Sequence, residues 1–225
     1  MEPNSPGDCA LALAIPLTRE RFLTALAQPE KHDFVFHFRK GRGLERADPE
    51  FCWLVYEAEE LAFVSAVCTE VSSRGVTVVN DVELTQLTAL FNQFSIVTLV
   101  AHSKFVEDKP VIEFSDGLHT TPELIQSIPI DFSGLLDLTI CHSVIPAADI
   151  RSERRCLVAG NRKPAELRSR MYLYGLEIEL LAKNPRPFVD VIKEVHSKRD
   201  LYDNKGGTLW KILGWLSSVM RRRRR

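Results

Sequence analysis

Two apolar segments, Ile96-Val-Thr-Leu-Val-Ala-His102 and Leu135-Leu-Asp-Leu-Thr-Ile-Cys141, decide how this chain folds. Each segment is almost continuously apolar up to its last residue, which is typical of a strand buried on both faces in a parallel sheet. Between them lie a short strand at residues 111–114, a turn at Ser115-Asp-Gly117, and a helix that begins at Thr121-Pro-Glu123 with Thr121 as its cap. This order of strand, helix and strand predicts two parallel strands with their C-terminal ends at one edge of the sheet.

The rest of the chain continues the alternation of helices and strands. Residues 17–28 have helical periodicity with Thr18 as N-cap, whereas phenylalanines recur at every second position of residues 33–39 and predict a strand. The pattern as a whole predicts an α/β fold, a three-layer α-β-α sandwich with a mostly parallel central sheet. The other expected elements are a charged loop at 40–49, a mixture of strand and helix at 51–69, a strand at 76–79, a helix capped by Asn80 or Asp81 that runs through Leu84 to Phe91, a strand at 156–159, and helices at 164–182 and 187–197.

Length and composition favour a single globular domain. The 225 residues are enough for one large core, and a chain with 45% hydrophobic and 26% charged residues is of ordinary globular composition. We expect the domain to span residues 1–205 and a tail to span residues 206–225. The net charge of −1 includes +5 from Arg221 to Arg225, which leaves −6 for the rest of the chain.

The cysteines indicate a reducing compartment. There are five, without CxxC spacing, and no secretory signal precedes them, because the apolar run Cys9–Pro16 is short and lacks a basic region. We therefore expect free thiols and a cytoplasmic location.

Chemistry is expected where the two apolar strands end. Sites in open α/β sheets form outside the carboxyl ends of the strands, and His102 and Cys141 each follow such a strand. A thiol becomes a strong nucleophile as thiolate, and a neighbouring imidazole promotes that form or protonates a departing amine. This pairing suits acyl transfer.

The same segments resemble the CHAT group of caspase-like cysteine peptidases, in the clan that also contains caspases, separases and legumains. That group has a hydrophobic strand ending in His-Gly, a spacer with a short strand and a turn, a helix, and a second hydrophobic strand ending in Cys. The matching stretches here are Ile96 to Ser103, Ile112 to Leu124 and Leu135 to Ser143. The resemblance covers residues 80–143 and implies a caspase-like fold without a cofactor or metal.

The resemblance also implies an activity and its residues. Cys141 would attack the peptide carbonyl, His102 would protonate the leaving nitrogen, and the backbone N–H groups of Ser103 and Cys141 would form the oxyanion hole. Ser103 stands where the family usually has Gly, and His142 stands where it often has Glu or Gln. An acidic S1 pocket would use the nearest carboxylates, which are Asp116 and Asp137.

Relatives of this kind imply an antiviral or cell-death effector in bacteria, with an activating partner protein and a protein substrate such as a pore-forming protein. The rival interpretation is an inactive caspase-like adaptor that binds a partner or a membrane through its tail. Zinc could in principle be bound by Cys141, His142, His102 and His119. These residues do not have the CxxC or HxxxH spacing that is usual for zinc ligands. Nucleotide binding is disfavoured because the chain has no GxGxxG or GK[ST] motif.

The tail combines apolar residues with arginines. Its apolar stretch is too short to span a bilayer, and its tryptophans and arginines suit contact with an anionic membrane surface or a partner. The alternative is a helix packed on its own domain, followed by a solvated run of charge. No specific nucleic-acid target is expected. The tail residues on which these interpretations depend are Leu209, Trp210, Ile212, Leu213, Trp215, Leu216, Val219, Met220 and Arg221 to Arg225.

Overall fold

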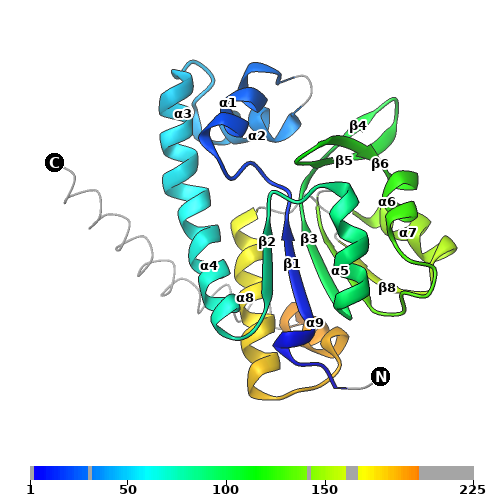
Figure 1. Ribbon diagram of the computed structural model, residues 1–225. Coiled ribbons are helices and arrows are strands. Elements are labelled where there is room, and N and C mark those ends of the chain that lie inside the picture. The colour runs from blue at the N-terminus through cyan, green and yellow to red at the C-terminus, as the bar shows by residue number, and fades with distance from the viewer. Residues whose placement is uncertain (1–2, 30–31, 141–142, 161–166, 198–225) are drawn as a thin grey trace.

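The computed structural model describes residues 3–29, 32–140, 143–160 and 167–197. Within these ranges it contains a five-stranded parallel sheet in the order β2-β1-β3-β7-β8, with helices on both faces (Figure 1). This arrangement confirms the expected α/β class and its three layers. The strands are β1 (Cys9–Leu13), β2 (Thr77–Asn80), β3 (Ile96–Val100), β7 (Leu135–Thr139) and β8 (Leu157–Gly160).

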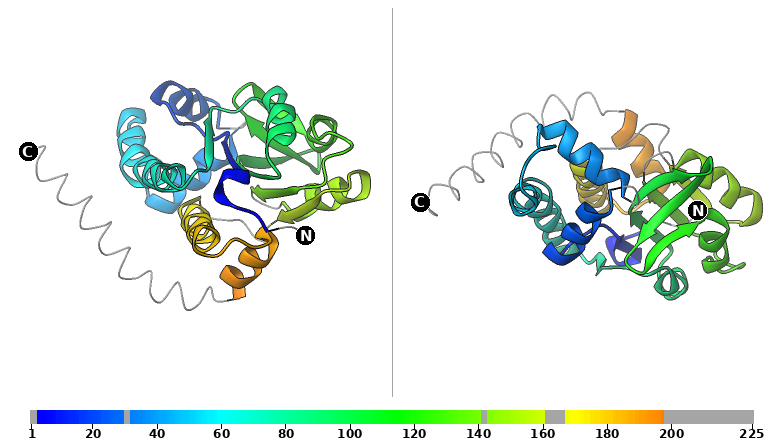
Figure 2. Two further views of the ribbon diagram at one scale, coloured as in Figure 1. Left: turned by 60° about the horizontal axis from the view of Figure 1, so that its bottom comes forward. Right: turned by 90° about the horizontal axis from the view of Figure 1, so that it is seen from above.

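The two faces of the sheet are covered by different sets of helices. One face packs against α5 (Leu87–Gln93), α6 (Thr121–Ser127) and α7 (Val144–Glu153). The other face packs against α4 (Ala62–Ser73), α8 (Leu167–Lys183) and α9 (Phe188–Ser197), and Figure 2 shows α8 and α9 on the side of the sheet away from α5. The predicted strand at 156–159 and the predicted helices at 164–182 and 187–197 are confirmed for the residues described.

Strand β1 is an inner strand of the sheet, although the sequence analysis recognised Cys9–Pro16 only as a short apolar run. All of its residues are buried, and it pairs in parallel with β2 on one side and β3 on the other. Ala10 and Ala12 face the α5 side, while Leu11 and Leu13 face the α8 side. Its run of alanine and leucine contains no β-branched residue, so the sequence does not distinguish a buried strand from a buried helix here.

Three helices form a separate aromatic cluster above the C-terminal edge of the sheet, at the top of Figure 1. They are α1 (Arg19–Ala27), α2 (Asp33–Arg42) and α3 (Pro49–Tyr56), and a π-helical turn, η2 (Glu57–Leu61), joins α3 to α4. The rings of Phe22 and Tyr56 stack at 4.6 Å between their centroids. Thr18 caps α1 as predicted, since its Oγ1 accepts a hydrogen bond from the Arg21 N–H at 3.3 Å.

The prediction of a strand at residues 33–39 is wrong, because these residues belong to α2. Alternate positions also include an i, i+4 pair, and Phe34 and Phe38 lie on one face of the helix. Val35 and Phe38 are buried, whereas Phe36 is half exposed. The expected loop begins only at Gly43, which ends α2 in the left-handed conformation with φ 65°. Residues 51–69, expected as a mixture, are helical throughout.

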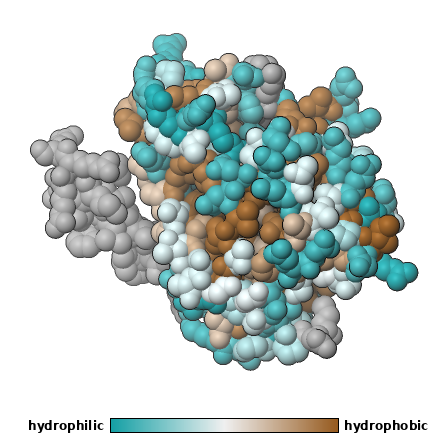
Figure 3. All heavy atoms as spheres, in the orientation of Figure 1, coloured by the Kyte–Doolittle hydropathy of each residue, from teal (hydrophilic) through white to brown (hydrophobic). Residues whose placement is uncertain are grey.

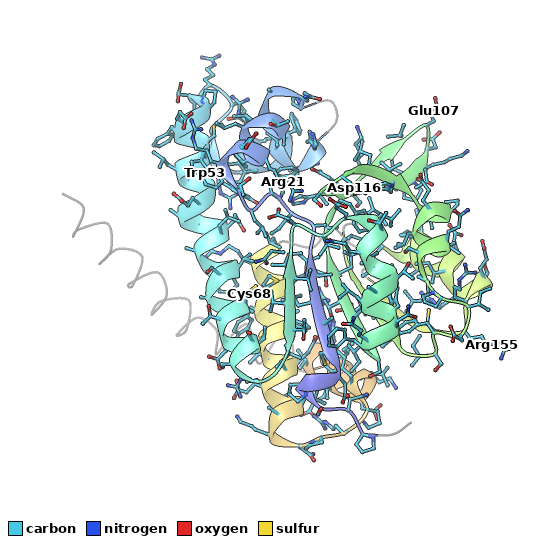
Figure 4. All side chains as sticks on the ribbon, viewed as in Figure 1. Arg21, Trp53, Cys68, Glu107, Asp116 and Arg155 are labelled. Carbon is cyan, nitrogen blue, oxygen red and sulfur yellow. The ribbon has the colours of Figure 1, made fainter. Side chains whose placement is uncertain are left out.

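A small antiparallel sheet follows β3, and only its middle strand was predicted. Its order is β4 (His102–Val106), β5 (Lys109–Phe114) and β6 (Gly117–Thr120). His102 is therefore the first residue of a strand and not a loop residue. The β4–β5 turn is made by Glu107 and Asp108, both with positive φ, and Figure 4 shows Glu107 at its tip.

Two predicted caps are displaced by one to three residues. Thr120, not Thr121, caps α6, and its N–H donates to Glu123 Oε2 at 2.7 Å. Glu83, not Asn80 or Asp81, precedes the helical segment η3 (Leu84–Gln86) that continues into α5. Cys9, Cys52, Cys68 and Cys156 are free thiols as expected, and Cys141 lies outside the described residues. No described helix has both the length and the apolar character needed to cross a bilayer.

Candidate active site

Strands β3 and β7 are parallel neighbours that end in register, and Figure 1 shows the end of β3 at the upper edge of the sheet. Their register pairs Val100 with Thr139, and the Ala101 N–H approaches the Thr139 carbonyl oxygen at 3.5 Å. The first predicted site residue, His102, comes two positions after Val100. The second, Cys141, comes two positions after Thr139 and, with His142, lies outside the described residues.

The His102 ring packs against a helix that the sequence analysis missed. It stacks on Phe34 of α2 with centroids 3.9 Å apart and an interplanar angle of 4°. Its Nε2 is buried and has no hydrogen-bond partner among the described residues. Burial lowers the pKa of His102 to about 4, although the Glu113 carboxylate opposes this effect. The imidazole is therefore neutral at physiological pH and can accept a proton.

Glu113 is the carboxylate residue that stands opposite this histidine in the small sheet. It lies directly opposite His102 in the β4–β5 register, and its side chain is only 9% exposed. Glu113 Oε1 is 2.9 Å from Nδ1 of His32, the residue that precedes α2. We call His32, Phe34, His102 and Glu113 the edge cluster.

Arg21 adds positive charge to the same edge of the sheet. Its guanidinium donates to the Ile15 carbonyl at 3.3 Å and to the Ala14 carbonyl at 3.4 Å, and it pairs with Asp81. These acceptors follow β1 and β2 directly. Figure 4 shows Arg21 above the strand ends. Its charge contributes to the lowered pKa of His102.

Two of the remaining predicted residues are close in sequence to His102. Ser103 lies in β4 opposite Ile112, so its backbone direction is set by the small sheet. Asp116 follows β5, and its Oδ1 accepts a hydrogen bond from the Leu84 N–H at 3.4 Å and lies 3.1 Å from His119 Nε2. The Asp116 carboxylate therefore joins the small sheet to η3.

Asp137 lies in the middle of β7 and is buried under α8. Its Oδ2 is 3.2 Å from Nη2 of Arg170, which also donates to the Thr139 hydroxyl at 3.1 Å. The carboxylate is therefore neutralised by Arg170 and faces a helix.

Arg170 belongs to a second cluster, which the sequence analysis missed and which we call the α8–α9 cluster: Asp137, Arg170, Glu177 and His196. Arg170 Nη1 is 3.1 Å from His196 Nε2, which lies 3.7 Å from Glu177 Oε1. Glu177 is completely buried, and burial together with the charge of Asp137 raises its pKa to about 8. Arg170 and Glu177 lie among the apolar positions of α8, which was the available signal for a buried ionic cluster.

The surface beside the edge cluster is partly apolar. Phe105, Val106 and Leu118 of the small sheet are each more than one third exposed. Figure 3 shows apolar surface at the upper right, where this sheet lies. An extended polypeptide could contact apolar side chains next to His102.

A cavity of about 650 Å³ lies at the edge of the large sheet where its strands begin. Its lining includes Ser95, Ile96, Gly134 and Leu135, which stand where β3 and β7 begin, so it is separate from the edge cluster. Within the described part of the chain, no group of three His, Cys, Asp or Glu residues is arranged to hold a metal ion. Two of the four residues considered for zinc, Cys141 and His142, lie outside that part.

A search with protein-family models found none that matches this chain, and a search of curated proteins found no similar sequence.

Proposed function

We propose that this chain is a caspase-like cysteine endopeptidase in which Cys141 and His102 form the catalytic dyad. The observation that carries the proposal is the in-register ending of β3 and β7 at one edge of the sheet. Neighbouring strands lie about 4.8 Å apart. Cys141 is bonded to the described residue Ile140, which limits the separation of their Cα atoms to about 3.8 Å. A thiol is therefore expected within reach of the His102 imidazole.

The neutral imidazole acts first as a base. Nε2 of His102 takes the thiol proton as Cys141 Sγ attacks the substrate carbonyl carbon, and a C–S bond forms. The resulting imidazolium then gives its proton to the leaving nitrogen as the C–N bond breaks. Water hydrolyses the remaining thioester, which frees the acid product and the thiol. The N–H groups of Ser103 and Cys141 are the proposed donors to the oxyanion.

The lowered pKa of His102 determines the resting state in this mechanism. A histidine that protonates only near pH 4 does not form an imidazolium–thiolate pair at neutral pH. Its Nε2, which is buried and has no partner among the residues that the structure describes, is instead the proposed proton acceptor. The proton therefore moves during attack on the substrate.

The wider role is proposed from the family resemblance. The protein would act in the cytoplasm as an effector of a bacterial defence or cell-death system, switched on by a partner protein. Its substrate would be another protein, such as a pore-forming one. The basic tail at residues 208–225 would bring an acidic domain to an anionic membrane surface.

Cleavage assays on single-residue variants test the proposal. Cys141→Ala and His102→Ala should each lower the cleavage of proteins encoded nearby, or of a peptide library, by about 10²-fold or more. Cys68→Ala is the matched control because Cys68 is a partly exposed thiol on α4, away from the edge cluster. Equal cleavage by the wild type and all three variants would exclude the peptidase.

The inactive adaptor is the second candidate. The observation in its favour is the close stacking of His102 on Phe34, which is also how a purely structural histidine packs. In that case Cys141→Ala would leave partner binding unchanged, and the wild type would cleave nothing in the same assay.

A further inference from the structure

We propose that Glu113 is a positioning residue for His102 and that His32 holds Glu113 in place; this inference rests on the proposed function. His32 lies outside the segments on which the His–Cys pairing was based. Glu113 lies in the spacer between those segments, where it had been given no role. Both contribute to the edge cluster, in which two histidines and one carboxylate lie close to the carboxyl ends of the strands.

The register of the small sheet places Glu113 beside the His102 ring. Residues directly opposite each other in antiparallel strands point to the same face, with Cβ atoms about 4.5–5.5 Å apart. His102 and Glu113 are such a pair. Their shared face is turned towards α2, because Phe34 stacks on His102 and His32 lies 2.9 Å from Glu113.

The groups around His102 favour a role for this carboxylate in proton transfer. The charged or titratable neighbours are Glu113 on β5, His32 before α2 and Arg21 on α1, and of these Glu113 alone favours the protonated imidazole. Tyr56 on α3 also faces this region, and its hydroxyl donates to the Pro16 carbonyl at 3.2 Å. A buried imidazolium is costly without a nearby anion. Glu113 therefore stabilises the form of His102 that exists after it has taken the thiol proton.

His32 and Phe34 define how the carboxylate and the ring are held. His32 contacts one oxygen of Glu113, which restrains the rotamer of a long side chain. Phe34 lies flat against the His102 ring, so the imidazole is prevented from tilting on that side. Phe34 thus restricts the tilt of the His102 ring, while the charge of the restrained Glu113 favours its protonated form.

The experiment compares Glu113→Gln with Glu107→Gln. Both changes replace a carboxylate by an amide on the β4–β5 hairpin, but Glu107 stands at its exposed tip. Glu113→Gln should lower kcat by about tenfold or more with little change in KM, because Glu113 acts through His102 and not on the substrate. Glu107→Gln should behave as wild type, and Glu113→Asp should recover part of the loss.

A second readout does not require activity. In protein labelled with ¹³C at histidine Cε1, NMR titration should show His102 protonating at lower pH in Glu113→Gln than in wild type, because a favourable negative charge has been removed. An unchanged His102 midpoint in folded Glu113→Gln would overturn the inference. If the His102 midpoint shifts in Glu113→Gln but the wild type cleaves no substrate, the proposed function is excluded and the coupling of Glu113 to His102 stands.

Discussion

Among the residues that the structure describes, the edge cluster and the α8–α9 cluster both combine histidines with buried carboxylates, and they differ in what neutralises the carboxylate. In the α8–α9 cluster, the permanent charge of Arg170 balances Asp137, and the cluster lies between the sheet and two helices. In the edge cluster, Glu113 faces His32 and His102, whose charges depend on protonation. Asp137 therefore has a partner of permanent charge, whereas the groups that face Glu113 are imidazoles.

The two clusters also differ in position along the strands. Asp137 lies in the middle of β7, and Arg170 reaches along the covered face to Thr139. His102 lies beyond the end of β3, where loops and small elements meet. We therefore expect changes in the α8–α9 cluster to alter stability and changes in the edge cluster to alter chemistry.

The largest effect is expected for Arg170→Gln. Removing the guanidinium leaves Asp137 buried and unpaired, which should lower the free energy of unfolding by about 3–5 kcal/mol. Urea unfolding followed by circular dichroism measures this change. The matched control is Lys183→Gln on the same helix, whose exposed pair with Glu179 should contribute about 0.5 kcal/mol or less. Equal stability of the two variants would show that the Arg170–Asp137 pair does not stabilise the fold.

A smaller effect, visible as pH dependence, is expected for Glu177→Gln. The folded state raises the pKa of Glu177 from 4.5 to about 8, so it binds this proton more tightly than the unfolded chain does. The contribution to stability is therefore full below pH 4.5 and is lost as the pH rises to about 8, at no more than about 1.4 kcal/mol per pH unit.

The Gln variant cannot ionise at this position. Its stability relative to wild type should therefore improve between pH 5 and pH 8, as measured by urea unfolding at several pH values. A constant difference between the two proteins across this range would show that Glu177 does not hold a proton in the folded state.

The sequence predicted the strands that end at the site better than it predicted the residues around His102. Ile96–Val100 and Leu135–Thr139 are long apolar runs, and the crossover rule then fixed their parallel pairing. Strand β1 is equally buried but escaped notice because its Cys-Ala-Leu-Ala-Leu run contains no β-branched residue to mark a strand. The two strands that end at the site were therefore predictable without the neighbouring strand β1.

The partners of His102 were harder to predict for two separate reasons. Phe34 lies on a helix whose phenylalanine spacing also fits a strand, so its side chain was assigned to the wrong kind of element. Glu113 acquires its role only through the antiparallel pairing of β5 with β4, a strand whose polar and exposed residues gave no signal. Contacts between elements that are distant or misassigned do not follow from local periodicity.

The central claim is that residues 102 and 141 meet at one edge of the sheet, and a crosslink measures this directly. In His102→Cys, mild oxidation with diamide should join position 102 to Cys141 by a disulfide, identified by peptide mapping and mass spectrometry, because Cα atoms about 4.4–6.8 Å apart permit the bond. Val106→Cys, at the far end of β4, should form no such link. Failure of His102→Cys to crosslink, while its new thiol and Cys141 both remain reactive to maleimide, would contradict the account.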